Sequence, residues 1–232
     1  MDIKAINNSA HGQLKIKNNE NLQQSKNKHF APVVVQEFIA ASQEFPIVFI
    51  KDSGTGQFKA IALLGLKTEE NLFFRDDAWQ AAYKPEGLTL YPFLLHQEKN
   101  RDNAVLCFDE DSFLVNKTEG EALFDKNGVQ NQWLTDKGER IVSYIEKTNT
   151  TENFIKLLLD KKLLSPQTLN LKLEGEDEYS INGLYVIDEK KLAALSEQSF
   201  SELRKVLALP AIYAAIFSLQ RINHLVRIKL AD

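Results

Sequence analysis

The residue types best suited to catalysis or metal binding in this chain are four histidines and one cysteine, namely His11, His29, His96, His224 and Cys107. A ferrous oxygenase uses two histidines and a carboxylate on one face, usually with a histidine and an aspartate two apart on a strand. The sequence holds no His-x-Asp, and the nearest pattern is His96-Gln97-Glu98. Because these three residues are also typical of a strand that ends in a polar turn, we predict no metal site and no cofactor.

Cys107 and Asp109 share one face of a predicted strand, because side chains two positions apart on a strand point the same way. A free cysteine in the apolar segment 104–108 is usually a small buried hydrophobe, and a reactive thiolate is the alternative. A single cysteine allows no internal disulfide and no cysteine-based zinc cage. A reducing compartment therefore fits the sequence.

The acidic runs of the chain are Asp76-Asp77, Asp109-Glu110-Asp111 and residues 174–178. General acid–base pairs work from sheltered pockets that raise one pKa, whereas these runs fall in predicted turns, where water keeps them ionised. Gly54-Thr55-Gly56 lacks the third glycine of a dinucleotide-binding loop, and the sequence holds no nucleophile elbow and no H-E-x-x-H zinc motif. No recognisable catalytic constellation is present.

An aromatic set consisting of Trp79, Tyr83, Tyr91 and Phe93 is the most concentrated candidate binding surface. Such a set could form an amphipathic wall for a peptide or an aromatic side chain, with His96 nearby. The alternative is that the four rings pack a sheet against a helix. Pro92 suits the first residue of a strand, where no ladder hydrogen bond is lost, so we predict that Phe93 is buried.

The chain has 232 residues, of which 44% are hydrophobic and 26% are charged, and its formal net charge is −4. This composition is that of an ordinary globular protein. An acidic chain with interspersed lysines lacks the basic face that nucleic acid binding needs. The first eight residues carry no apolar signal segment, and the apolar run 208–217 is too short to span a bilayer. We expect a cytoplasmic protein without membrane insertion.

The first half of the chain reads as an arm, a helix and a sheet. Residues 1–31 are polar and predict a loose arm with one edge strand near residues 14–16. Residues 34–45 show helical periodicity, which Pro46 ends. Predicted strands follow at residues 46–50, 58–65, 71–74, 93–96 and 104–108. Their short polar connections favour an antiparallel meander over about residues 46–109.

The second half of the chain reads as helices around one hairpin. One helix is predicted through Trp133 and Ile145, and a second begins at an N-cap near Thr151. A second hairpin, about 168–187, turns at the acidic residues 174–177. C-terminal helices are predicted at 192–195, 200–207 and 212–225, with Pro210 in a first turn. The class is α+β, with one cooperative domain over residues 32–232.

Short motifs distributed along the chain carry a family resemblance. They are His11-Gly12 followed by Leu14, residues 32–38, 45–49, 62–66 and 70–73, Trp79, Tyr83, Pro85, residues 91–93, 107–110, 121–124 and 184–189, Leu192 and Ser218-Leu219. In this order they resemble the bacterial SapC-like family, named for a protein encoded with surface-layer genes. One departure is Phe45, where the family pattern leads us to expect a tyrosine before Pro46.

The resemblance implies a pathway but no reaction, cofactor or site residue. SapC-like proteins lack a signal peptide and are often encoded beside tryptophan-halogenase-like flavoproteins, cupin-type oxygenases and TonB-dependent outer-membrane receptors. The resemblance therefore implies a shared uptake or modification pathway. A halogenase-like flavoprotein or a cupin-type oxygenase is the expected partner.

Two classes of function follow from these observations. The first is a non-enzymatic binding or accessory protein in a surface-layer or TonB-receptor-linked pathway. The alternative is an enzyme or metalloprotein whose site is assembled from dispersed residues such as His29, Tyr91, His96, Cys107 and Asp109. A purely structural surface-layer component is a third class, against which the missing export signal counts. Whether the five dispersed side chains converge on one pocket discriminates between the first two classes.

Overall fold

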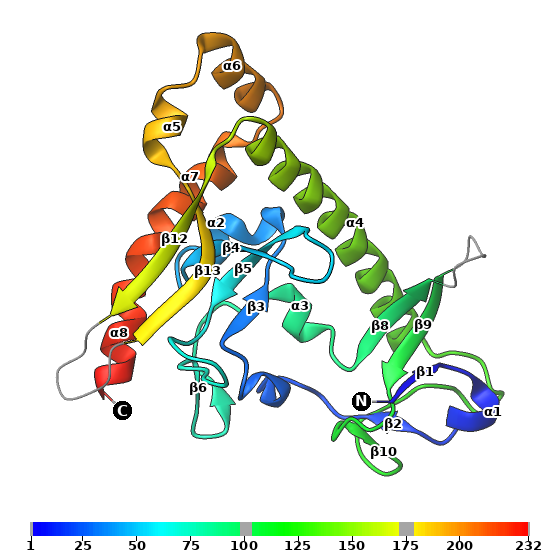
Figure 1. The fold of residues 1–232 in the computed structure, drawn as a ribbon. Coiled ribbons are helices and arrows are strands. Elements are labelled where there is room, and N and C mark those ends of the chain that lie inside the picture. Colours follow the sequence, from blue (N-terminus) through cyan, green and yellow to red (C-terminus); the bar gives the residue numbers. More distant parts are fainter. Residues whose placement is uncertain (1, 98–103, 172–178, 232) are drawn as a thin grey trace. The chain divides into compact units, whose positions relative to one another are not determined.

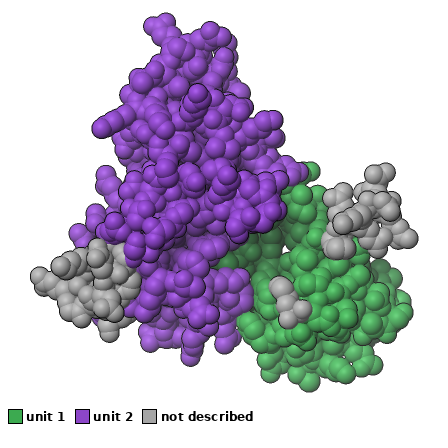
Figure 2. All heavy atoms as spheres, viewed as in Figure 1, with its two compact units in different colours: residues 1–22, 87–146 green, residues 23–86, 147–232 purple. Residues whose placement is uncertain are grey.

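The computed structural model of the protein describes residues 2–97, 104–171 and 179–231 (Figure 1). The chain divides into two compact units, drawn in different colours in Figure 2. Unit 1 holds residues 1–22 and 87–146, and unit 2 holds residues 23–86 and 147–232. Helices and open antiparallel sheets occur together, which confirms the predicted α+β class.

Unit 1 contains two three-stranded antiparallel sheets, with strand orders β1-β9-β8 and β10-β2-β11. Its strands are β1 (Ile3–Ala5), β2 (Lys15–Ile16), β8 (Phe93–Gln97), β9 (Ala104–Asp109), β10 (Val115–Asn116) and β11 (Glu121–Ala122). The predicted pair β8–β9 is confirmed. The predicted edge strand near residue 15 is wrong in one respect, because β2 lies at the centre of its sheet with β10 and β11 on its two sides.

The other elements of residues 1–31 are α1 (Asn8–His11), the 3-10 helix η1 (Gln23–Ser25) and β3 (Phe30–Pro32). Apolar side chains of this polar segment are nevertheless buried, among them Ile16, Leu22 and Ala31. Whether the segment behaves as an arm beside a single cooperative domain of residues 32–232 stays a prediction.

The core of unit 1 is a cluster of buried aliphatic and aromatic side chains, namely Ile16, Leu90, Phe93, Phe108, Leu114, Leu123, Phe124, Leu134 and Ile141. Phe93 is 6% exposed, which confirms its predicted burial. It is the first residue of β8 and follows Pro92, whose missing N–H costs no ladder bond there.

Unit 2 is built on a five-stranded antiparallel sheet with the order β12-β13-β4-β5-β3. The strands not yet given are β4 (Ile47–Lys51), β5 (Phe58–Leu63), β12 (Leu164–Leu171) and β13 (Tyr179–Ile187). Both predicted hairpins, β4–β5 and β12–β13, are confirmed. The acidic turn predicted at residues 174–177 lies outside the described residues. The apolar run that opens β4 is fully buried, as expected for a strand at the centre of a sheet.

The predicted meander over residues 46–109 is divided among three sheets instead of forming one. Its third strand is the short β6 (Phe74–Arg75), which within the described ranges pairs with β7 (Ala78–Trp79) alone. Asp76 and Asp77 connect them with φ angles of 51° and 55°. Two successive positive φ values are typical of a tight hairpin turn, so this segment closes on itself.

Three predicted helices differ in length from the helices of the structure. The helix expected at residues 34–45 is reduced to the 3-10 helix η2 (Val35–Glu37) and α2 (Phe38–Ala41). The two helices expected between residues 133 and 160 form one helix, α4 (Gln132–Asp160). Thr151 is not an N-cap, because its hydroxyl donates to the Lys147 carbonyl one turn earlier and so lets the helix continue.

The remaining helices are α3 (Glu86–Thr89), α5 (Glu189–Ala193), α6 (Glu197–Lys205), α7 (Leu209–Ser218), the 3-10 helix η3 (Leu219–Arg221) and α8 (Ile222–Ala231). Pro210 lies in the first turn of α7, as predicted. No single helix of the described residues is long and apolar enough to cross a membrane. By length and composition alone, residues 197–205 and 209–231 pass this test together, with a bend of 97° between them.

Candidate functional site

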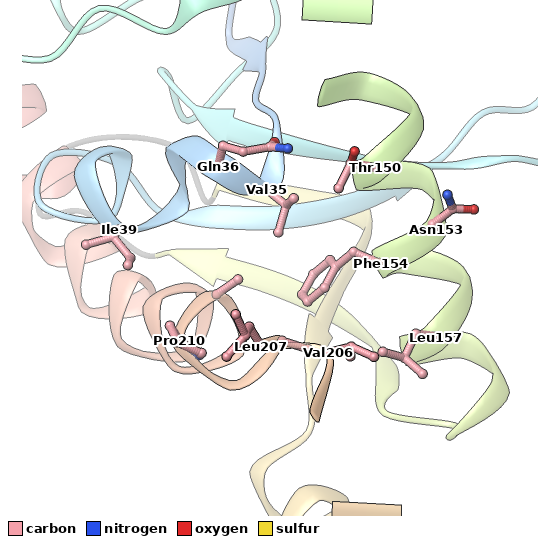
Figure 3. A pocket seen from close by; sticks show the side chains of 12 residues that line it. Val35, Gln36, Ile39, Thr150, Asn153, Phe154, Leu157, Val206, Leu207 and Pro210 are labelled. Carbon is pink, nitrogen blue, oxygen red and sulfur yellow. The ribbon is translucent and has the colours of Figure 1, made fainter. Parts of the chain in front are cut away.

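A largely apolar cavity of about 610 Å³ lies in unit 2 between η2–α2, the second half of α4 and the loop that joins α6 to α7 (Figure 3). It is lined by Val35, Gln36, Ile39, Thr150, Asn153, Phe154, Leu157, Val206, Leu207, Ala208, Pro210 and Ala211. Its volume is within the range of small-molecule sites, about 300–1,000 Å³.

Both small and large apolar side chains line the cavity. Phe154 is buried and extends from α4 toward the α6–α7 loop. Ala208 in this loop and Ala211 in the first turn of α7 add only methyl groups to the lining. Leu207 has a φ of 56°, a conformation that favours glycine or asparagine. This turn leaves the Leu207 side chain 80% exposed at the cavity, although burial of an aliphatic side chain is favourable.

Glu37, which follows the lining residue Gln36, holds the η2 wall in place. Its carboxylate is 5% exposed and accepts hydrogen bonds from the Val34 N–H at 3.0 Å and the Glu86 N–H at 2.7 Å. The Tyr83 hydroxyl donates a third bond to it at 2.7 Å. Burial raises the pKa of the Tyr83 phenol, and the neighbouring carboxylate of Glu37 raises it further.

A second set of contacts fixes the α4 wall against η2. The Val35 N–H donates to the Thr151 hydroxyl oxygen at 2.8 Å. Lys147, one turn earlier on α4, pairs with Glu86 at 2.7 Å, and Glu86 is bonded to Glu37 through its N–H. The two walls of the cavity are therefore cross-linked by hydrogen bonds to buried or half-buried groups.

The twelve lining residues include no charged side chain, histidine or cysteine. Gln36, Thr150 and Asn153 lie along one margin of the cavity, and Val206 and Leu207 lie along the opposite margin (Figure 3). Amide and hydroxyl groups both donate and accept hydrogen bonds, so the polar margin suits a neutral polar group. The arrangement can bind an uncharged, mostly apolar molecule, and it offers no general acid or base.

A family model named SapC matches residues 6–225 of the chain. The chain belongs to the SapC family. No curated protein and no solved structure matches it. Family membership confirms the resemblance seen in the sequence and assigns no reaction to this SapC chain.

Of the predicted binding residues in this SapC chain, Trp79 and Tyr83 belong to unit 2. Trp79 is 8% exposed, packs on Phe45 and Phe73, and donates its indole N–H to the Tyr83 carbonyl at 3.0 Å. Tyr83 contacts Glu37 as described above. Neither residue lines the cavity. Trp79 packs in the core and Tyr83 donates a hydrogen bond to the Glu37 carboxylate. A ligand-binding role for them stays a prediction.

Tyr91 and Phe93 belong to unit 1. The Tyr91 hydroxyl donates to Asp109 at 3.2 Å, and the other Asp109 oxygen accepts the Asp2 N–H at 2.9 Å. Burial raises the pKa of Tyr91, and the negative charge of Asp109 raises it further. A hydrogen bond with Ser112 lowers the pKa in part. The structure therefore brings together two of the five dispersed residues considered for an enzyme site.

The other three dispersed residues lie on β9, in unit 2 and on β8. Cys107 is buried on β9, and His29 lies in unit 2, where burial lowers its pKa. His96 pairs with Val105 through the strand backbone, and its side chain lies outside the described part of the structure. No cluster of three or more metal-binding side chains occurs in residues 2–97, 104–171 and 179–231.

Sequence reasoning missed two features of this SapC chain. His11 is 3% exposed, accepts the Asn7 N–H at its Nδ1, and directs Nε2 to Glu110 at 3.7 Å. The cavity was missed because its lining comes from residues 35–39, 150–157 and 206–211, which form no local motif. The available signal was the apolar pair Val206-Leu207 beside Pro210, which the predicted helix 200–207 absorbed.

Proposed function

We propose that this SapC-family chain is a non-enzymatic binding protein whose unit 2 cavity holds a small, uncharged, mostly apolar molecule. The observation that carries the proposal is the 610 Å³ cavity, whose lining is apolar except for amides and hydroxyls. A charged ligand group would lose its hydration there without finding a counter-charge, so the lining favours neutral ligands.

The family resemblance extends the proposal to a pathway. We place the protein in a surface-layer or TonB-receptor-linked uptake or modification pathway, in the cytoplasm. There it delivers or protects an apolar small molecule for a halogenase-like flavoprotein or a cupin-type oxygenase. This role needs a pocket that binds without turnover, which agrees with a lining that holds no acid, base or nucleophilic thiol.

The direct test is titration with N-phenyl-1-naphthylamine, an uncharged apolar dye that fluoresces when it leaves water. We expect saturable binding at one site and a rise in melting temperature with dye concentration, because a ligand of the native state stabilises it by mass action. Ile39→Lys introduces a charge at the cavity lining and should weaken dye binding at least tenfold.

Leu230→Lys is the matched control, because Leu230 and Ile39 are both 59% exposed and Leu230 does not line the cavity. Both variants change the net charge by the same amount. Equal loss of dye binding in the two variants would contradict the cavity as the site. Stoichiometric iron or zinc in the purified protein, lost in Cys107→Ser, would instead support the enzyme or metalloprotein alternative.

A further inference from the structure

Strand β8 is an edge strand of unit 1. The strand order of its sheet is β1-β9-β8, and within the described residues β8 pairs with β9 alone. An edge strand carries backbone N–H and C=O groups that can pair with another chain, which is the basis of recognition by strand addition.

The hydrogen-bond pattern identifies which residue of β8 is available. The Asp109 N–H donates to the Pro92 carbonyl, so Leu94, two positions along, also directs its backbone groups toward β9. Leu95 therefore directs its N–H and C=O to the free edge.

Leu106, which lies opposite Leu95, supports this assignment of the Leu95 backbone groups to the free edge. Its carbonyl accepts the Ile6 N–H on the far side of β9, as expected for a pair that exchanges no hydrogen bonds. Among the described residues, the backbone N–H and C=O of Leu95 have no hydrogen-bond partner.

A groove of about 490 Å³ lies on the same face as the Leu95 side chain. Leu95 and Leu106 form one wall, and α4 forms the other with Leu134, Gly138 and Val142 among its residues. The absent side chain of Gly138 matters here, because a Cβ at this position would contact Leu106 at 3.7 Å and narrow the groove. In a strand added beside Leu95, every second side chain would point into this groove.

The groove carries negative charge. Glu139 and Glu146 both line it from α4, two turns apart on the same helix face. Two basic side chains of α4 that are close to Glu139 in sequence contact other groups, since Lys137 lies over the Trp133 ring and Arg140 donates to Thr89. None of the described residues that line the groove is basic, so its charge complements lysine or arginine.

We propose that β8 and this groove form a docking surface for an extended peptide segment of a partner protein, with basic and aliphatic side chains at alternate positions. The peptide adds a strand beside Leu95 and places a basic group against Glu139. This surface lies in unit 1 alone and does not depend on the cavity of unit 2.

The probe is a fluorescein-labelled six-residue peptide with lysine, valine and lysine at alternate positions and threonine or serine between them. We expect the full-length protein to bind it and raise its fluorescence anisotropy. A version with glutamate in place of lysine should bind at least tenfold more weakly. A version N-methylated at two neighbouring amides, one directed to each edge, should also lose at least tenfold, because it keeps its charges but cannot extend the sheet.

Glu139→Lys tests the groove, with Glu121→Lys on β11 as a matched charge change outside it. We expect Glu139→Lys alone to weaken the lysine peptide at least tenfold and to strengthen the glutamate peptide. Equal affinity for the N-methylated peptide overturns strand addition, and equal effects of the two variants overturn the groove. Absence of peptide binding in a protein that dimerises, with the dimer lost in Glu139→Lys, would assign the surface to a second copy of the chain and overturn the proposal.

Discussion

Glu37 in unit 2 and Asp109 in unit 1 are both buried carboxylates that accept a hydrogen bond from a tyrosine hydroxyl, but they are held differently. Glu37 accepts three bonds, and its bond from Tyr83 is 2.7 Å long. Asp109 accepts the Asp2 N–H and a longer bond of 3.2 Å from Tyr91. The more tightly bonded Glu37 supports the wall of the cavity, whereas Asp109 bonds Asp2 to β9.

The difference indicates what the aromatic set does in this protein. The hydroxyls of Tyr83 and Tyr91 each donate a hydrogen bond to a carboxylate, and the rings of Phe93 and Trp79 are buried in the cores of their units. Hydrogen bonds to a buried charge are stronger than neutral ones, so the local structure depends on these residues even where no ligand is present.

Truncation of a core ring should lower the free energy of unfolding the most, and the other variants are compared with this loss. Phe93→Ala should lower the free energy of unfolding by about 3–5 kcal/mol, because it removes a buried ring and leaves a void. Urea unfolding monitored by circular dichroism measures it. A loss below about 1 kcal/mol would mean that Phe93 does not support the unit 1 core and would favour its role as a contact surface.

Removal of the two carboxylates should lower the free energy of unfolding by different amounts. Glu37→Ala leaves three donors without an acceptor and should cost about 3–4 kcal/mol. Asp109→Ala leaves two and should cost about 2 kcal/mol. Urea unfolding of both variants at pH 7 gives the ratio. An equal loss in the two would break the comparison.

The tyrosine hydroxyls should show the same order with smaller effects. Tyr83→Phe should cost about 1.5–2 kcal/mol, because its hydroxyl donates a short bond to a buried carboxylate. Tyr91→Phe should cost less than about 1 kcal/mol, since its bond is longer. Dye binding to the unit 2 cavity should weaken in Tyr83→Phe and stay unchanged in Tyr91→Phe. The opposite pattern would mean that Glu37 does not position the cavity wall.

The alkaline limb of the stability profile should show the smallest effect. Burial raises the pKa of Tyr83 in the folded state, so the unfolded chain releases this proton first as the pH rises. The stabilisation that the raised pKa provides is therefore complete below the ordinary tyrosine pKa of about 10 and is lost progressively as the pH rises above it. Tyr83→Phe should remove the part of the fall in unfolding free energy between pH 9 and 11 that arises from Tyr83. An unchanged pH dependence in this variant would contradict the raised pKa.

Local patterns predicted the hairpins of this chain, because their strands and turns are close in sequence. The β4–β5 and β8–β9 pairs needed only alternating or continuous apolar runs separated by polar turns. The central position of β2 could not be predicted, since it depends on pairing with residues 115–122, about a hundred positions away.

The helices and the candidate site show the same limit. The pattern at Thr151 predicted a helix start, but its hydroxyl bonds to the backbone of the preceding turn and the Val35 N–H bonds to it. The first of these contacts is local and the second is not. Likewise, Glu37 reads as an ordinary surface glutamate in the sequence, and its burial depends on Tyr83 and Glu86.

The interleaving of the two units has a consequence for protein synthesis. The chain passes from one unit to the other after residues 22, 86 and 146, so neither unit is complete until long after its first residues are made. Strand β4 pairs with β13 at Phe49 and Ile50, and β13 leaves the ribosome more than a hundred residues later. Until then the apolar β4–β5 hairpin keeps an unpaired edge, which is prone to aggregation in a nascent chain. Folding of unit 2 therefore finishes only near the end of translation, and chaperones that shield β4 should raise the yield of native protein.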